Sequence, residues 1–186
     1  MKKFLFAAAL AVSMPGVAMA QDASTATAPD GTPAFGIEPY VGVLGGWTQF
    51  DKDSEFGSPR GGRMDGGLIS GVAGVNVPLG PVFVGAEGNA TYGFGDVDWA
   101  YGVKGRVGAR AGDSGMVYVS GGYQWVKGAR AYPNRQDWIY GVGVEVGPKD
   151  IGLGGITTNS GIRLRLSAET YDFDSIQPMA GVIAHF

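Results

Sequence analysis

Apolar and polar residues alternate along most of this chain with a period of two. In the segment GIRLRLSAE (residues 161–169), Arg163, Arg165 and Glu169 share one parity, whereas Ile162 and Leu164 share the other. Successive side chains of a β-strand point to opposite faces, so this alternation predicts a strand with one charged and one apolar face. The environment of each face then becomes the main question about the fold.

The same pattern predicts eight strands and no amphipathic helix after residue 20. The segments between them carry the Gly, Pro, Asp and Asn residues that favour turns. The strands are expected near residues 35–49, 67–78, 82–95, 99–111, 115–127, 137–147, 161–172 and 176–186.

The two faces of these strands differ sharply. One face collects the charges: Glu38, Glu87, Lys104, Arg106, Arg110, Glu145, Arg163, Arg165 and Glu169. The other face is built of aliphatic, aromatic, Gly and Pro residues, with Thr170 as its one clearly polar member. Strands of about ten residues with this dyad pattern are typical of membrane barrels. We therefore expect an all-β, eight-stranded antiparallel up-and-down transmembrane β-barrel, closed because an open sheet edge in hydrocarbon leaves backbone groups unpaired.

The charged face would then line a narrow lumen, where charges must be paired or hydrated. Four carboxylates and five cations point there, which predicts a lumenal ion network. If the GDVDW turn sets the register, Glu87 lies opposite Gly108 and diagonal to Arg106 and Arg110. Glu145 is expected at a depth similar to that of Arg163 or Arg165.

Aromatic residues predict the orientation of the barrel. With the chain starting in the periplasm, they gather at the outer ends of the strands, as expected for an interfacial girdle. The girdle consists of Trp47, Tyr92, Trp99, Tyr101, Tyr123, Trp125, Trp138 and Tyr140. An even number of strands also places both termini on the periplasmic side.

The N-terminus and the composition add a location. Residues 1–20 have a basic start, an apolar run and an Ala18-Met19-Ala20 site, which predicts a signal peptide cleaved after Ala20. Residues 21–34 are small and polar, which predicts a disordered lead-in, and residues 35–186 form the barrel domain. Cleavage leaves 12 basic and 17 acidic residues, so nucleic acid is not expected as a partner. The chain has no Cys, which excludes disulfides and thiol chemistry.

Several short motifs together resemble the small outer-membrane β-barrels of the opacity-protein and OmpA-like transmembrane class. They are YVGVLGGW (40–47), VYVSGGYQW (117–125), YGVGVEVG (140–147), IRLRLSAETYDF (162–173) and the terminal GVIAHF (181–186). The resemblance implies a monomeric, plugged barrel in the outer membrane of a Gram-negative bacterium, with roles in envelope integrity and surface contact. It also implies that Phe186 is the signal for the barrel-assembly machinery. Ala184 and the long inner turn 147–160 depart from the family pattern.

Candidate catalytic and metal sites are weak. Asp51, Asp53 and Glu55 have calcium-loop spacing, but Phe56 and Gly62 replace the required Gly and Glu, so no metal is expected. The G-x-G pairs lack the third glycine of a nucleotide fingerprint, so no cofactor is expected. His185, the only histidine, is expected inside the barrel near the periplasmic end, and Ser54, Ser58 and Ser70 have no His partner near the outer leaflet.

Three classes of function remain. The favoured one is a non-enzymatic structural and interaction barrel, with loops 51–66 and 128–137 as contact surfaces for a surface or host ligand. The alternative is a small ion or solute pore, which nine charges together with Tyr40, Leu44, Phe83 and Ile139 would crowd. A lipid-modifying enzyme is third, because it lacks a catalytic set. Membrane lipid and lipopolysaccharide are the expected partners of the outer face.

Overall fold

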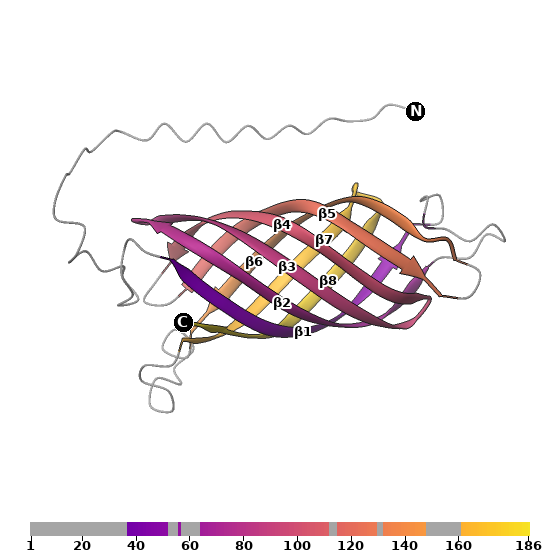
Figure 1. Cartoon of the computed structure of the whole chain (residues 1–186), viewed down its shortest axis with the longest axis horizontal. Helices are drawn as coiled ribbons and strands as arrows, with labels where there is room; N and C mark the ends of the chain where they lie inside the picture. Colours follow the sequence, from indigo (N-terminus) through magenta and orange to yellow (C-terminus); the bar gives the residue numbers. More distant parts are fainter. Residues whose placement is uncertain (1–36, 52–55, 57–63, 112–114, 130–131, 148–160) are drawn as a thin grey trace.

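The computed structural model describes residues 37–51, 56, 64–111, 115–129, 132–147 and 161–186. These residues form a closed barrel in which each strand pairs with its chain neighbours and β1 pairs with β8 (Figure 1). Every pairing is antiparallel, which confirms the predicted fold class. The strands are β1 (Glu38–Phe50), β2 (Asp65–Leu79), β3 (Val82–Gly95), β4 (Val97–Ala111), β5 (Gly115–Gly128), β6 (Arg135–Val146), β7 (Ile162–Tyr171) and β8 (Ser175–His185).

The two ends of the barrel are distinguished by their connections. The loop end carries the connections β1–β2, β3–β4, β5–β6 and β7–β8, and the terminal end carries the other connections, the start of β1 and the C-terminus (Figure 1). The β7–β8 turn is tight, and Asp172 and Phe173 both have positive φ, at 42° and 65°. Two consecutive positive φ values are what a type I′ hairpin turn requires. Asp174 N–H closes this turn on Tyr171 O at 2.8 Å.

Strand boundaries differ from the predicted ones by two or three residues at several ends. β1 begins at Glu38 instead of residue 35, and β2 begins at Asp65 instead of residue 67. The ladder between these two strands runs as far as Gln49 and Asp65, and a further bond joins Phe50 N–H to Met64 O at 3.0 Å. Backbone pairing therefore extends the hairpin into residues that, by composition, favour a turn.

The predicted register between β3 and β4 is wrong. Glu87 lies opposite Lys104, and Gly108 lies opposite Phe83. Tyr92 and Trp99 are the last cross-strand pair before the turn, so the chain reverses within the residues between them. Gly95 adopts a φ of 142°, which allows this sharp reversal. The turn is therefore shorter than the GDVDW segment, and the residue opposite Glu87 shifts by four positions, from Gly108 to Lys104. Arg106 is still diagonal to Glu87 and contacts it as predicted, whereas Arg110 pairs with Glu38 instead.

Burial alternates along each strand as the sequence pattern predicts. In β1 and β4, for example, Tyr40, Leu44 and Lys104 are buried, whereas Val43 and Val103 are exposed. Two inward glycines make room for large rings: a Cβ at Gly74 would collide with the Tyr40 ring, and one at Gly143 would collide with the Tyr118 ring. No helix in the described part of the chain is long and apolar enough to cross a membrane.

Candidate functional site: the outer belt and the filled lumen

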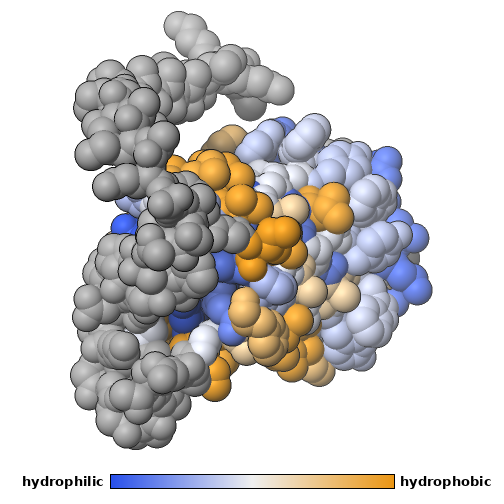
Figure 2. Space-filling model, turned by 60° about the vertical axis from the view of Figure 1, so that its left-hand side comes forward, coloured by the Kyte–Doolittle hydropathy of each residue, from blue (hydrophilic) through white to orange (hydrophobic). Residues whose placement is uncertain are grey.

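The outer wall of the barrel is apolar over most of its height. Val41, Val103, Val119, Val142 and Leu166 each expose about half of their surface, between 47% and 60%. Figure 2 shows hydrophobic residues (orange) on the visible wall of the barrel. More hydrophilic residues (blue) gather at the right-hand edge of the view. An exposed apolar surface that continues from strand to strand is far larger than a water-soluble monomer normally carries.

A belt of aromatic rings follows the wall near the loop end. Tyr92 packs edge-on against Phe94 and Trp99, at centroid distances of 5.1 and 5.0 Å. Tyr101 stacks on Trp125 at 5.5 Å, and Tyr123 packs on Trp125 and Trp138.

The belt continues to the β7–β8 turn, where Tyr140 stacks on Phe173 at 5.5 Å. On the other side, Trp47 of β1 lies against the outward side of Gly67. All eight residues predicted as a girdle are therefore on the outer wall at one end, and their placement at a membrane–water interface stays a prediction.

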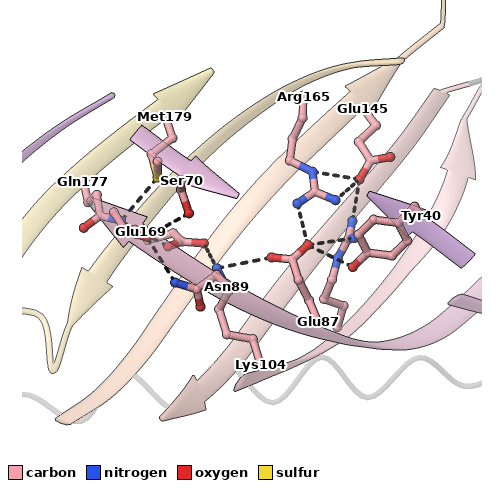
Figure 3. Close-up of polar contacts among 12 residues, drawn as sticks. Tyr40, Ser70, Glu87, Asn89, Lys104, Glu145, Arg165, Glu169, Gln177 and Met179 are labelled. Atoms are coloured by element: carbon pink, nitrogen blue, oxygen red, sulfur yellow. Dashed lines mark hydrogen bonds and ion pairs between the residues drawn. The ribbon is translucent and has the colours of Figure 1, made fainter. Parts of the chain in front are cut away.

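A cluster of four charged residues fills the middle of the lumen (Figure 3). The Arg165 guanidinium donates to Glu87 at 2.5 Å through Nη1 and to Glu145 at 3.0 Å through Nε. Arg106 reaches the same two carboxylates, with Glu145 at 2.6 Å and Glu87 at 3.4 Å. The four side chains come from β3, β4, β6 and β7, so the contacts tie opposite walls of the barrel together.

Aromatic rings enclose these guanidinium groups. Arg106 lies 3.9 Å from the centroid of the Tyr118 ring, and Tyr40 and Phe83 lie at 5.1 and 5.8 Å. Tyr40 also donates its hydroxyl hydrogen to Glu87 at 2.9 Å. A desolvated cation over a ring gains about 2 kcal/mol or more, which partly offsets the loss of water around the arginines.

A second polar group lies toward the loop end. Lys104 donates to Glu169 at 2.5 Å and lies 3.4 Å from Glu87, so it joins this group to the central cluster. Gln177 donates to Glu169 at 3.4 Å. The Ser70 and Thr91 hydroxyls share a hydrogen bond of 2.8 Å (Figure 3).

At the terminal end the charges are fewer and lie among apolar side chains. Arg110 pairs with Glu38 across β4 and β1. The Arg163 guanidinium contacts the Met116 sulfur. His185 hydrogen-bonds Glu145 at 2.8 Å and stacks on Tyr40 at 5.2 Å. The predicted inward position of His185 is therefore seen, with a carboxylate and a ring as its neighbours.

At the loop end the lumen is closed by rings. Phe56, from the β1–β2 connection, stacks on Phe50 at 4.5 Å and packs on Tyr171 at 5.4 Å. Phe50, Phe56 and Tyr171 are no more than 2% exposed. Val97, Val126 and Ile139 complete this apolar layer. We call it the apolar cap.

All nine residues of the predicted lumenal network have side chains buried in the barrel. Glu145 pairs with Arg165, at the similar depth that the sequence indicated. The sequence did not indicate that Lys104 reaches Glu169, that Arg106 reaches Glu145, or that Tyr118 covers Arg106. The calcium-loop comparison identifies Phe56 only as a misfit, although a lone Phe in a polar loop is a signal for burial.

Other predicted features lie at the edges of the described chain. Phe186 is 75% exposed and its N–H donates to Pro39 O at 2.9 Å. Residues 1–36, and with them the signal peptide and the lead-in, lie outside the described residues, as do Asp53, Ser54, Glu55 and Ser58. Among the residues that are described, no three His, Asp or Glu side chains are grouped as a metal site requires.

Comparisons with solved structures give likenesses to bacterial surface barrels. They include Neisserial surface protein A, NspA (13% identity, 81% of this chain, 99% of that chain, TM-score 0.46). They also include Ail of Yersinia pestis, solved with the heparin analogue sucrose octasulfate (12% identity, 81% and 99%, TM-score 0.49). A third is a loop-deletion variant of OmpT, an outer-membrane protein of Vibrio cholerae (14% identity, 80% and 53%, TM-score 0.33). No protein-family model matches the chain, and no curated protein matches it.

Proposed function

We propose that this protein is a non-enzymatic barrel of a Gram-negative outer membrane, which contributes to envelope integrity and to surface contact through loops 51–66 and 128–137. The apolar outer wall supports the membrane location, because it matches hydrocarbon on all sides of a closed barrel with no free sheet edge. The signal peptide predicted at residues 1–20, with cleavage after Ala20, fits the same route.

The observation that carries the proposal is the filled lumen. Glu87, Glu145, Arg106 and Arg165 cross the full width of the barrel, and each is at most 4% exposed. The apolar cap closes the lumen above them. A barrel filled in this way offers no open lumen to a substrate. Other molecules would contact only its outer face and its loops.

Orientation follows from the aromatic belt and the connections. The belt near the loop end supports an orientation with that end at the outer surface, in which both ends of the barrel sequence would lie in the periplasm. Phe186 is exposed next to the β1–β8 seam, a position that suits a role as the signal for the assembly machinery. Membrane lipid and lipopolysaccharide would contact the wall of a single barrel, and a surface ligand would contact the loops.

A small pore is the second candidate, favoured by two internal cavities that share Thr91 and Gln177. Each has room for about one water molecule. In the described part of the lumen these cavities do not add up to a passage, since the charged cluster lies on one side of them and the apolar cap on the other.

The test combines a gel and a conductance trace on the full chain refolded in lipid vesicles. A stable barrel migrates differently with and without boiling, and a filled lumen gives no steady conductance in a planar bilayer. An unchanged mobility would contradict the barrel in membranes, and steady conductance would replace the plugged barrel with the pore.

A matched pair of variants tests which face meets lipid. Val119→Arg should cost about 2–4 kcal/mol, because a cation at the middle of the bilayer is most unfavourable there. Val119→Leu, which keeps the same outward position apolar, should cost about 0.5 kcal/mol or less. Equal losses in urea unfolding would contradict the assignment of the faces.

A further inference from the structure

Two hollows on the outer wall meet at the aromatic belt. The upper one, of about 560 Å³, lies at the loop end of β5 and β6 and is lined in part by Lys127, Asn134, Arg135 and Gln136. The lower one, of about 530 Å³, lies on the wall below it. Both volumes fall in the range of about 300–1,000 Å³ that is typical of ligand sites. Tyr101 and Trp125 line both hollows.

The two hollows have opposite chemistry. The upper one holds two cations and two amides, and no carboxylate is among the described residues that line it. The lower one is almost wholly apolar, and its exposed floor consists of Gly71, Ala73 and Ala90 on β2 and β3. Small side chains lower the wall here, whereas Tyr101 and Val103 beside them stand out at 57% and 60% exposed. The upper hollow is thus cationic and the lower hollow apolar, and the stacked rings of Tyr101 and Trp125 lie where the two meet.

Lys127 is available to an anion despite its own partner. It lies 3.2 Å from Asp98 of β4, but its side chain is 60% exposed, so the ammonium keeps hydrogens for a second acceptor. Arg135, the first residue of β6, lies opposite Val126 in the ladder at the rim of the barrel, is exposed, and carries a planar fork that suits a phosphate. Tyr101 and Trp125 of the belt lie between these cations and the apolar hollow. The order of cations, aromatic rings and apolar surface matches the order of headgroup, interface and acyl chain in a lipid.

We propose that these hollows form a binding site for one phosphate-bearing lipid, with its headgroup at Lys127 and Arg135 and one acyl chain on the Gly71–Ala73–Ala90 floor. The proposal rests on the membrane placement proposed above and adds a fixed lipid position to it. Charge complementarity selects the anionic headgroup, and the apolar hollow that adjoins the cationic one at Tyr101 and Trp125 favours a lipid over a soluble phosphate.

Tryptophan quenching by brominated lipids tests the site on the full-length barrel. Trp125 is kept as the single reporter by W47F/W99F/W138F, and Trp47 is kept by W99F/W125F/W138F as the control. Trp47 stands on β1, four strands from β5 in the ring of eight, so it reports the ordinary lipid around the barrel. The barrels are refolded in phosphatidylcholine vesicles that contain brominated phosphatidylcholine or brominated phosphatidylglycerol.

At Trp125 the relative binding constant for the phosphatidylglycerol should exceed that for the phosphatidylcholine by about fivefold, the effect of one cation near an anionic headgroup. At Trp47 the two lipids should quench alike. Lys127→Gln with Arg135→Gln should bring the ratio at Trp125 down to that at Trp47. Ala90→Leu, which fills the floor, should also lower it, whereas Ala180→Leu on the exposed side of β8 should not.

The outcomes separate the two proposals. Equal ratios at Trp125 and Trp47, or a ratio at Trp125 that survives both Lys127→Gln with Arg135→Gln and Ala90→Leu, would overturn the lipid site and leave the membrane barrel standing. Absence of quenching at both reporters by either lipid would overturn the membrane placement itself, and the lipid site with it.

Discussion

The loop end and the middle of the lumen are filled in different ways. Toward the loop end, Phe50, Phe56 and Tyr171 close the barrel with rings. Toward the middle, Glu87, Glu145, Arg106 and Arg165 close it with charges that pair with one another. Rings need only a fitting shape, whereas buried charges need every partner in place. The cap should therefore tolerate change gradually, and the charged cluster should fail abruptly.

The largest effect is expected from Glu145→Ala. Glu145 is fully buried and accepts from Arg106, Arg165 and His185, so its removal leaves two guanidinium groups short of a partner. The free energy of unfolding should fall by about 3–5 kcal/mol, the usual cost of breaking a buried ion pair. Urea titration in vesicles measures the loss, and planar-bilayer traces should show anion-selective openings as water follows the arginines. Val144→Ala, outward on the same strand, serves as the control and should leave the lumen closed.

Phe56→Ala should have the next largest effect, at about 3 kcal/mol, because a buried ring leaves a cavity in the cap. Conductance should remain absent, since the charged cluster still spans the lumen. Phe173→Ala is the matched control: that ring is 76% exposed, so its loss should cost about 0.5 kcal/mol or less. If Phe56→Ala opened a conducting path and Glu145→Ala did not, the cap and not the charged cluster would be the plug.

Glu169→Gln tests the second polar group, which lies between the apolar cap and the charged cluster. It keeps the shape of the side chain but removes the negative charge beside Lys104, 2.5 Å away, and should cost about 2 kcal/mol. Adding Lys104→Met should restore part of that loss, since it removes the cation that has lost the nearer of its two carboxylate partners. Thermal unfolding of the two single variants and the double variant measures the coupling. Strictly additive losses would mean that the pair does not act as a unit.

Ser70→Ala should give the smallest effect, about 1 kcal/mol, because it removes one neutral hydrogen bond to Thr91. The Thr91 hydroxyl keeps the Asn89 amide as a donor at 3.3 Å, so no charged group is left without a partner. Unfolding by urea at a common protein concentration checks the ranking against Ser167→Ala. A loss at Ser70 as large as that at Glu145 would contradict the distinction between neutral and charged filling.

Alternation alone predicted the eight strands and both faces, because a period of two survives errors of a few residues at strand ends. The pair Glu145–Arg165 was also accessible, since the two residues lie directly opposite each other on neighbouring strands. The pair Arg106–Glu145 was not, because β4 and β6 are not neighbours and the contact depends on how the closed ring staggers its strands. The turn at Gly95 shows the same limit locally: its length does not follow from GDVDW, so the residue opposite Glu87 is Lys104 and not Gly108, although the predicted diagonal contact with Arg106 is seen.

The contact between Arg165 and Glu87 joins residues 78 positions apart in sequence, on strands from opposite halves of the chain. Neither half-built sheet can make it, so an early intermediate would carry unmatched charges into hydrocarbon. Insertion and ring closure should therefore proceed as one cooperative transition, and contacts of such high sequence separation slow that transition. We therefore expect the side chains that pair across the closed barrel also to limit the rate at which it closes.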